Sequence, residues 1–104
     1  MIVKIPTKVR IGAYEYSISL TPMGEDYNKL GQCSTSKESI KIDSESSYRI
    51  KCVTFWHEIL HAIDDVYRGK MEEEEMERLA QSLTAIMLNE MGIVFDWSSV
   101  KDSH

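Results

Sequence analysis

The residues best suited to chemistry lie together in the stretch FWHEILHAIDD, which begins at Phe55. His57 and His61 are four residues apart, and Glu58 directly follows the first of them. On a helix, four residues make slightly more than one turn, so both imidazoles lie on nearly the same face. Two imidazoles at this spacing can direct ring nitrogens at one ion about 2.0–2.1 Å away. The spacing therefore predicts a Zn²⁺ site with His57 and His61 as ligands.

Glu58 has a different role in such an arrangement. A glutamate beside the first histidine does not easily bind the same ion, but it can reach a water that the ion holds. Zinc lowers the pKa of that water toward neutrality, and a nearby carboxylate can take the proton. The H-E-x-x-H spacing therefore predicts Glu58 as the catalytic general base in the hydrolysis of a peptide bond.

These residues need a helix to position them, and the surrounding pattern predicts one from about Tyr48 to Tyr67. Its apolar residues recur mostly at three- and four-residue steps. The apolar side can anchor the helix while the histidine side faces a cleft. Gly69 is the expected C-cap. The residues expected on the apolar side are Cys52, Trp56, Ile59, Ile63 and Val66.

A second helix is predicted from about Met71 to Glu90, with Gly92 after its end. Four consecutive glutamates, Glu72 to Glu75, occupy its start, where negative charge suits the helix dipole. The expected apolar stripe consists of Met76, Leu79, Leu83, Ile86 and Met87.

The segment before the first helix favours strands. Apolar and polar residues alternate from Ile2 to Leu20, which predicts a hairpin or a bent pair of strands, and QCSTSKESIKID predicts a second hairpin. TPMGEDYNKLG between them is predicted to be a loop, and the end of the chain a short strand or a packed tail. We expect one α+β domain over residues 1–104, a small antiparallel sheet packed on two core helices.

A catalytic zinc site needs a third protein ligand. A metzincin would need a glycine at position 64 and a histidine at position 67, where this chain has Asp64 and Tyr67. Asp65 lies about 12 Å along the helix from His57, too far for three successive turns to meet at one ion. His104, the last residue, is a poor fixed ligand. A glutamate of the second helix remains, and geometry alone does not select which one.

WHEILHAID followed by EEEMERLA resembles the small gluzincins, including the ImmA/IrrE-type metallopeptidases and short phage-encoded relatives. Their second helix carries a glutamate ligand in a pattern like E-x-x-A-[N/D]-x-[F/L]-A. Alignment on Leu79 and Ala80 puts Glu73 at the ligand position, while Met76 and Glu77 depart from the pattern. The resemblance thus implies Glu73 as the third metal ligand, and a shift in register leaves Glu72 and Glu75 open.

The resemblance also implies how a peptide or protein substrate is held. A strand beside the metal helix would pair with the extended substrate, and Glu38–Asp43 is the expected strand because it directly precedes that helix. If Glu73 binds the metal, Glu77 lies one turn later and could hydrogen-bond the free ring nitrogen of a ligand histidine. Asp64 or Asp65 could do the same.

Composition narrows the partners. The formal net charge is -5, which argues against non-specific binding to nucleic acid or to an anionic membrane. No signal peptide or long apolar run is recognisable, and the only two cysteines, Cys33 and Cys52, have no C-x-x-C spacing. We therefore expect a cytoplasmic protein; the oligomeric state is not predicted.

Two other functions compete with a peptidase. A metal-binding module could recognise a peptide or partner without cleaving it, and the short chain leaves little material for a deep cleft. A helical interaction domain without metal is disfavoured, because the first helix has one ionisable face and one apolar face.

Overall fold

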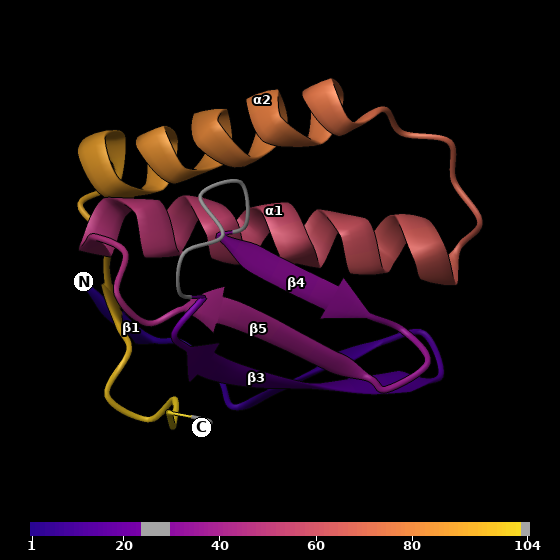
Figure 1. Cartoon of the computed structure of the whole chain (residues 1–104). Coiled ribbons are helices and arrows are strands. Elements are labelled where there is room, and N and C mark those ends of the chain that lie inside the picture. The colour runs from indigo at the N-terminus through magenta and orange to yellow at the C-terminus, as the bar shows by residue number, and fades with distance from the viewer. Residues whose placement is uncertain (24–29, 103–104) are drawn as a thin grey trace.

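The structure, a computed structural model, describes residues 1–23 and 30–102. A four-stranded sheet packs against helix α1 (Tyr48–Val66), and α2 (Glu73–Ala85) packs on the other side of α1 (Figure 1). The α+β class is confirmed, with the two histidines on the first helix and Glu73 on the second. None of the described helices is long and apolar enough to cross a membrane.

The sheet contains both predicted hairpins. β2 (Lys8–Ile11) pairs antiparallel with β3 (Tyr14–Thr21), and β4 (Gly31–Ser34) pairs antiparallel with β5 (Ser39–Asp43). Gly12 takes a positive φ of 60° in the first turn, a conformation that glycine adopts without a steric cost. Residues 24–29 of the predicted loop lie outside the described residues.

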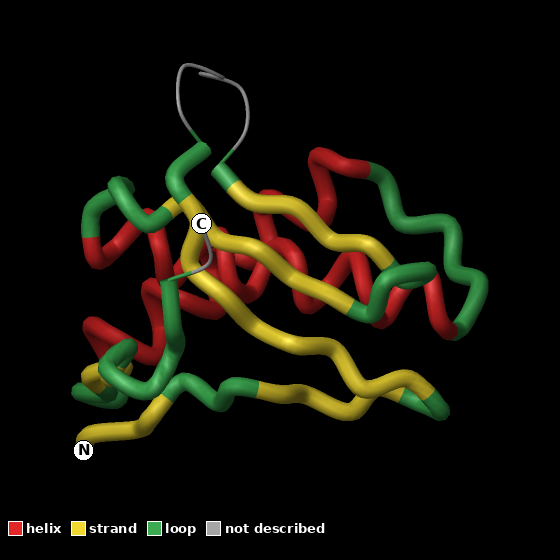
Figure 2. Tube along the Cα trace, turned by 60° about the horizontal axis from the view of Figure 1, so that its bottom comes forward, coloured by secondary structure: helices red, strands yellow, loops and turns green. Residues whose placement is uncertain are grey.

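The two hairpins join side by side through a parallel pairing of β3 with β5, which gives the strand order β2-β3-β5-β4 (Figure 2). The sheet is therefore mixed, and the expectation of a purely antiparallel sheet is corrected in this respect. Alternation of apolar and polar residues predicts which face is buried, but it does not predict the direction of a neighbouring strand. The consequence for function is that β4 lies at the edge of the sheet.

A separate pair of short strands links the two ends of the chain. β1 (Ile2–Lys4) runs parallel to β6 (Val94–Asp96), and the Ile5 amide extends the pairing by donating to the Asp96 carbonyl over 2.9 Å. The end of the chain was predicted to form a short strand or a packed tail, and the segment after the second helix forms the strand.

The core lies between the sheet and α1. Tyr16, Ile40, Ile42, Cys52 and Ala62 are fully inaccessible to solvent. The apolar side of α1 is narrower than predicted, because Ile63 remains exposed.

The ends of α1 are defined by side chains. Ser47 caps the first turn by accepting from the Ile50 amide over 3.3 Å. After the C-cap Tyr67, it is Arg68 and not Gly69 that takes the positive φ, at 53°. Gly69 is needed for a different reason: a Cβ there would collide with the Asp64 carboxylate.

α2 begins at Glu73, two residues after the expected start, and continues into the π-helical turn η1 (Ile86–Glu90). Its buried residues are Met76, Ala80 and Thr84. Leu79, Leu83 and Ile86 are exposed, so the predicted apolar stripe is only partly buried. The reason is that, among the described elements, α2 packs mainly on α1, and one neighbouring helix covers only a narrow face.

Candidate metal centre

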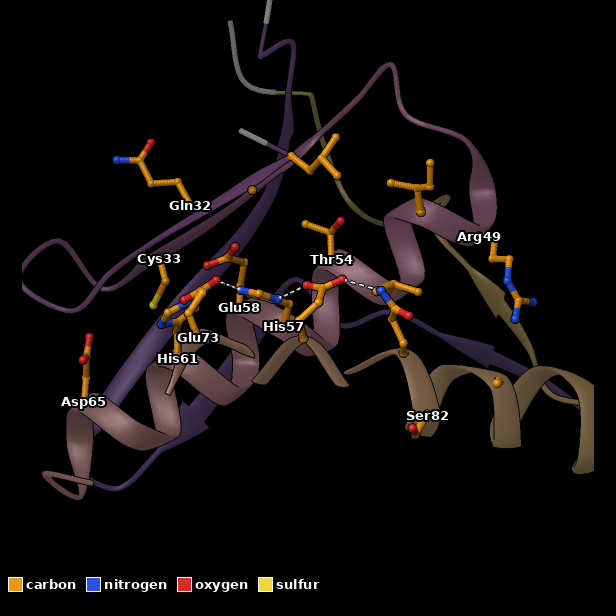
Figure 3. A pocket seen from close by; sticks show the side chains of 17 residues that line it. Gln32, Cys33, Arg49, Thr54, His57, Glu58, His61, Asp65, Glu73 and Ser82 are labelled. Atoms are coloured by element: carbon orange, nitrogen blue, oxygen red, sulfur yellow. Dashed lines mark hydrogen bonds and ion pairs between the residues drawn. The ribbon is translucent and has the colours of Figure 1, made fainter. Parts of the chain in front are cut away.

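A cavity of about 940 Å³ lies where α1, α2 and β4 meet (Figure 3). Both helices contribute residues at four-residue steps, a spacing that keeps side chains on one helix face. The line on α1 consists of Arg49, Val53, His57, His61 and Asp65. The line on α2 consists of Glu73, Glu77, Gln81 and Ala85. β4 adds Gly31, Gln32 and Cys33.

Glu73 joins the two histidines. Its Oε1 lies 2.6 Å from Nε2 of His57, and its Oε2 lies 2.8 Å from Nε2 of His61. One ligand atom from each of the three residues falls within 4.8 Å of the other two. The described residues therefore contain a His-His-Glu group that could hold a metal ion.

The second nitrogen of His57 is also engaged. Nδ1 lies 2.6 Å from Oε2 of Glu77, whose other oxygen accepts from the Gln81 amide over 2.7 Å. Without an ion, His57 needs a proton on both nitrogens to donate to both glutamates. With an ion at Nε2, a single proton on Nδ1 suffices, donated to Glu77. The arrangement of acids around His57 thus fits a bound cation.

The structure brings Glu73, rather than its neighbours, to the histidines. Glu72 is the N-cap of α2, and its side chain makes no capping hydrogen bond. Neither Glu72 nor Glu75 lines the cavity. The Glu73 side chain is 65% exposed, so it reaches the site from the solvent side of the cavity.

Glu58 lies deeper, in the gap between α1 and β4. The residue is 7% exposed, and burial raises the pKa of its carboxyl, while the nearby His61 and His57 oppose the rise. Gly31 makes room for it: a Cβ on Gly31 would lie 3.0 Å from Oε2 of Glu58 and 2.6 Å from Cγ2 of Thr54. Glu58 is therefore a poorly solvated carboxylate. Figure 3 shows it beside the His-His-Glu group.

The two aspartates after His61 do not support the histidines, so that expectation is wrong. The Asp64 carboxylate accepts from the Met71 amide over 3.2 Å and fixes the connection between α1 and α2. The Asp65 carboxylate accepts from Oγ1 of Thr35 over 3.0 Å, and Thr35 in turn lies 2.7 Å from the Tyr16 hydroxyl. Asp65 lines the cavity but anchors the turn between β4 and β5.

The expectation that Glu38–Asp43 pairs with substrate is also wrong. β5 occupies that segment, and its two edges are taken by β3 and β4. The strand at the cavity is β4, which becomes the edge because the β3–β5 pairing places β5 inside the sheet.

Some backbone groups of β4 face outward at the edge of the sheet. The Asp43 amide donates to the Leu30 carbonyl over 2.8 Å, so Leu30 belongs to a hydrogen-bonded pair with β5. Such pairs alternate in an antiparallel ladder, which means that Gly31 and Cys33 direct their amide and carbonyl groups away from β5.

Sequence reasoning missed Gly31, Cys33, Arg49 and Gln81 as cavity residues. Arg49 and Gln81 could have been found by extending the four-residue spacing from His57 and Glu77. Gly31 and Cys33 carry no comparable signal, because their position depends on how the sheet packs on α1. None of the described tyrosines lines the cavity, and Tyr27 lies outside the described residues.

Comparison with protein-family models, curated proteins and solved structures finds no match to this chain. The geometry of the site is therefore the basis for assigning a function.

Proposed function

We propose that this chain is a zinc-dependent peptidase in which His57, His61 and Glu73 bind the ion and Glu58 is the general base. The observation that supports it most is the convergence of Glu73 on both histidines, over 2.6 and 2.8 Å, from a different helix. Two imidazoles and one carboxylate are the ligand set of many catalytic zinc sites. Zinc bound there would polarise a peptide carbonyl and lower the pKa of a coordinated water.

Glu58 has the environment that a general base needs. Its carboxylate is nearly buried and lies beside the ligand histidines, and its pKa is raised toward the range where it can both accept and return a proton. It is one residue from His57 in sequence, so the helix directs it to one side of the ligand pair. We assign to it the transfer of the proton to the leaving amine.

The edge strand β4 is suited to hold an extended peptide across the site. Gly31 and Cys33 can exchange backbone hydrogen bonds with a peptide that lies antiparallel to β4. Such pairing binds the main chain of the peptide and is nearly independent of its side chains. An unstructured polypeptide is therefore the substrate class that fits this strand.

The proposal is tested by incubating the zinc-loaded protein with casein and identifying the fragments by mass spectrometry. Cleavage should stop when zinc is chelated and resume when zinc is restored. Glu58→Gln should lower the rate by about 10²–10⁴-fold, the usual contribution of a general base. Glu74→Gln, on an exposed residue of α2 that does not line the cavity, is the matched control and should cleave normally.

A metal-binding module that captures peptides without cleaving them is the second candidate. The edge position of β4 favours it as much as it favours a peptidase, because capture requires only strand pairing and the cavity. Zinc and peptide binding by a wild-type protein that leaves casein intact would select this function. Cleavage that persists in Glu58→Gln would instead show that the general base is misassigned.

A further inference from the structure

The cavity extends well beyond the His-His-Glu group. Arg49, in the first turn of α1, lines its far end, and Figure 3 shows Arg49 on the side of His57 opposite to Asp65. The other ionisable lining residues, apart from the two histidines and Cys33, are the acids Glu58, Asp65, Glu73 and Glu77. Arg49 is thus the single lysine or arginine among the described lining residues.

The guanidinium of Arg49 is available to a ligand. No described carboxylate lies within ion-pair distance of it. A cation in the first turn of a helix is also disfavoured by the helix dipole, so an anion beside it would relieve that repulsion. The cavity therefore carries charge of opposite sign at its two ends.

The distance along α1 between Arg49 and His57 can be compared with the length of a bound peptide. Arg49 precedes His57 by eight residues of α1, which is about 12 Å at 1.5 Å per residue. An extended peptide advances about 3.3 Å per residue, so the same span takes three or four peptide residues. Val53 lies between the two points on the same face of α1, and Ile50 and Ala85 also line the cavity, so this part of the cavity suits an apolar side chain.

The direction of β4 determines which side of the cleaved bond reaches Arg49. Gly31, at the start of β4, lies against Thr54 and Glu58, whereas the turn after Ser34 is bonded to Asp65 through Thr35. β4 and α1 therefore run in the same sense. A peptide antiparallel to β4 runs in the opposite sense and directs its C-terminal residues toward Arg49.

We propose that Arg49 is a specificity residue that selects peptides with a carboxylate three or four residues after the cleaved bond. This inference relies on the proposed function for the position of the bond and for the antiparallel pairing. The carboxylate can come from an acidic side chain or from the C-terminus of a short peptide, since a guanidinium pairs with either.

The test measures peptide binding without turnover. Fluorescein-labelled, alanine-based peptides of twelve residues carry one leucine for the apolar part of the cavity. Leucine is counted as the first residue after the bond. In one peptide the third and fourth residues are both Glu, and in the other they are both Gln. Both of these peptides end in an amide. A further Gln peptide stops at its fourth position with a free carboxylate. Fluorescence anisotropy gives the affinities for zinc-loaded Glu58→Gln protein.

The Glu peptide, the free-carboxylate peptide or both should bind about fivefold more tightly than the amidated Gln peptide, the upper range for an exposed ion pair. Arg49→Gln in the same background should abolish this preference, and Arg49→Glu should reverse it. Arg78→Gln is the matched control, because it removes the same charge from an exposed residue outside the cavity. Which peptide gains affinity identifies the source of the carboxylate.

Three results would overturn the inference: equal binding of all peptides, a preference that survives Arg49→Gln, or no binding of any peptide. Casein cleavage by the wild-type protein is measured separately. Arg49-dependent binding without cleavage would remove the proposed peptidase activity and leave the specificity residue in place. Cleavage without a carboxylate preference would support the peptidase activity and remove Arg49 as the specificity residue.

Discussion

The Glu77 carboxylate lies 2.6 Å from Nδ1 of His57 and so determines how that imidazole is oriented. A proton on Nδ1 donated to Glu77 leaves the lone pair of Nε2 free for an ion on the Glu73 side. Gln81 donates to the second oxygen of Glu77 over 2.7 Å and limits the rotation of the carboxylate. Glu73, Glu77 and Gln81 follow one another at four-residue steps on α2. The first is a candidate ligand, and the other two hold the ligand His57 in position.

Replacement of Glu77 by alanine should weaken zinc binding without removing a ligand. We expect a loss of about 10–100-fold in affinity, the usual effect of removing a carboxylate that orients a ligand histidine. Competition with a chromogenic chelator measures it. Glu74→Ala, which removes an exposed acid from the same helix, should leave the affinity unchanged; equal losses in both variants would mean that only net charge matters.

Gly31 should be intolerant of a side chain. A Cβ there would lie 2.6 Å from Cγ2 of Thr54, so Gly31→Ala must separate β4 from α1. We expect destabilisation by about 1–3 kcal/mol, typical of an overpacked core, together with reduced peptide cleavage. Thermal unfolding and the casein assay measure the two effects. Thr54→Ser removes the closest atom and should partly restore both; a fully stable Gly31→Ala protein would contradict the close packing.

Glu58→Gln should stabilise the metal-free protein at neutral pH. Burial raises the pKa of the Glu58 carboxyl, so the folded state binds this proton more tightly than the unfolded chain does. The resulting stabilisation is complete below the unfolded-state pKa and is lost as the pH rises through the folded-state pKa. At pH 7, the ionised Glu58 carboxylate therefore lowers the free energy of unfolding, and replacement by the neutral glutamine removes this penalty.

Thermal unfolding of both proteins in the presence of a chelator provides the measurement. Glu58→Gln should melt at a higher temperature than the wild type at pH 7, and the difference should shrink as the pH falls toward 4. A wild type that is the more stable at pH 7 would show that the carboxylate is well compensated in the absence of the ion.

Cys33 should be an unreactive thiol despite its place in the cavity wall. Burial, with the neighbouring charges of Glu58 and Asp65, raises the pKa of this thiol to about 12. At pH 8 the thiolate fraction falls about a thousandfold relative to a thiol with the ordinary value of 9.0. Alkylation of metal-free Cys52→Ala protein by iodoacetamide should accordingly be slow and should rise about tenfold per pH unit. A plateau near pH 9 would contradict it, and urea-unfolded protein provides the reference rate.

Local patterns in the sequence predicted the parts of the molecule that depend on local interactions. The apolar period placed α1 within one residue of its observed end at Val66, and alternation located both hairpins. The four-residue spacing of His57 and His61, and of Glu73 and Glu77, indicates that each pair shares one helix face. These features follow from helix and strand periods alone.

The predictions that the structure contradicts concern contacts between segments that are distant in the sequence. The parallel pairing of β3 with β5 places β4 at the edge of the sheet, and nothing in ESIKID or GQCS indicates that choice. Asp64 and Asp65 lie one turn from His61, yet the Met71 amide and Thr35 compete for their carboxylates. Which of Glu72 to Glu75 lies beside the histidines depends likewise on the packing of α2 on α1.

The proposed metal centre is tested most directly by comparing the zinc content and zinc affinity of the wild-type protein with those of Glu73→Ala. Equilibrium dialysis followed by elemental analysis should give one zinc per wild-type chain. Glu73→Ala should bind at least about 100-fold more weakly, because it loses a ligand in the first coordination shell. Glu75→Ala, the matched control from the same run of glutamates, should bind like the wild type. A wild-type chain that holds no zinc, or a Glu73→Ala chain that holds it equally well, would contradict the proposed centre.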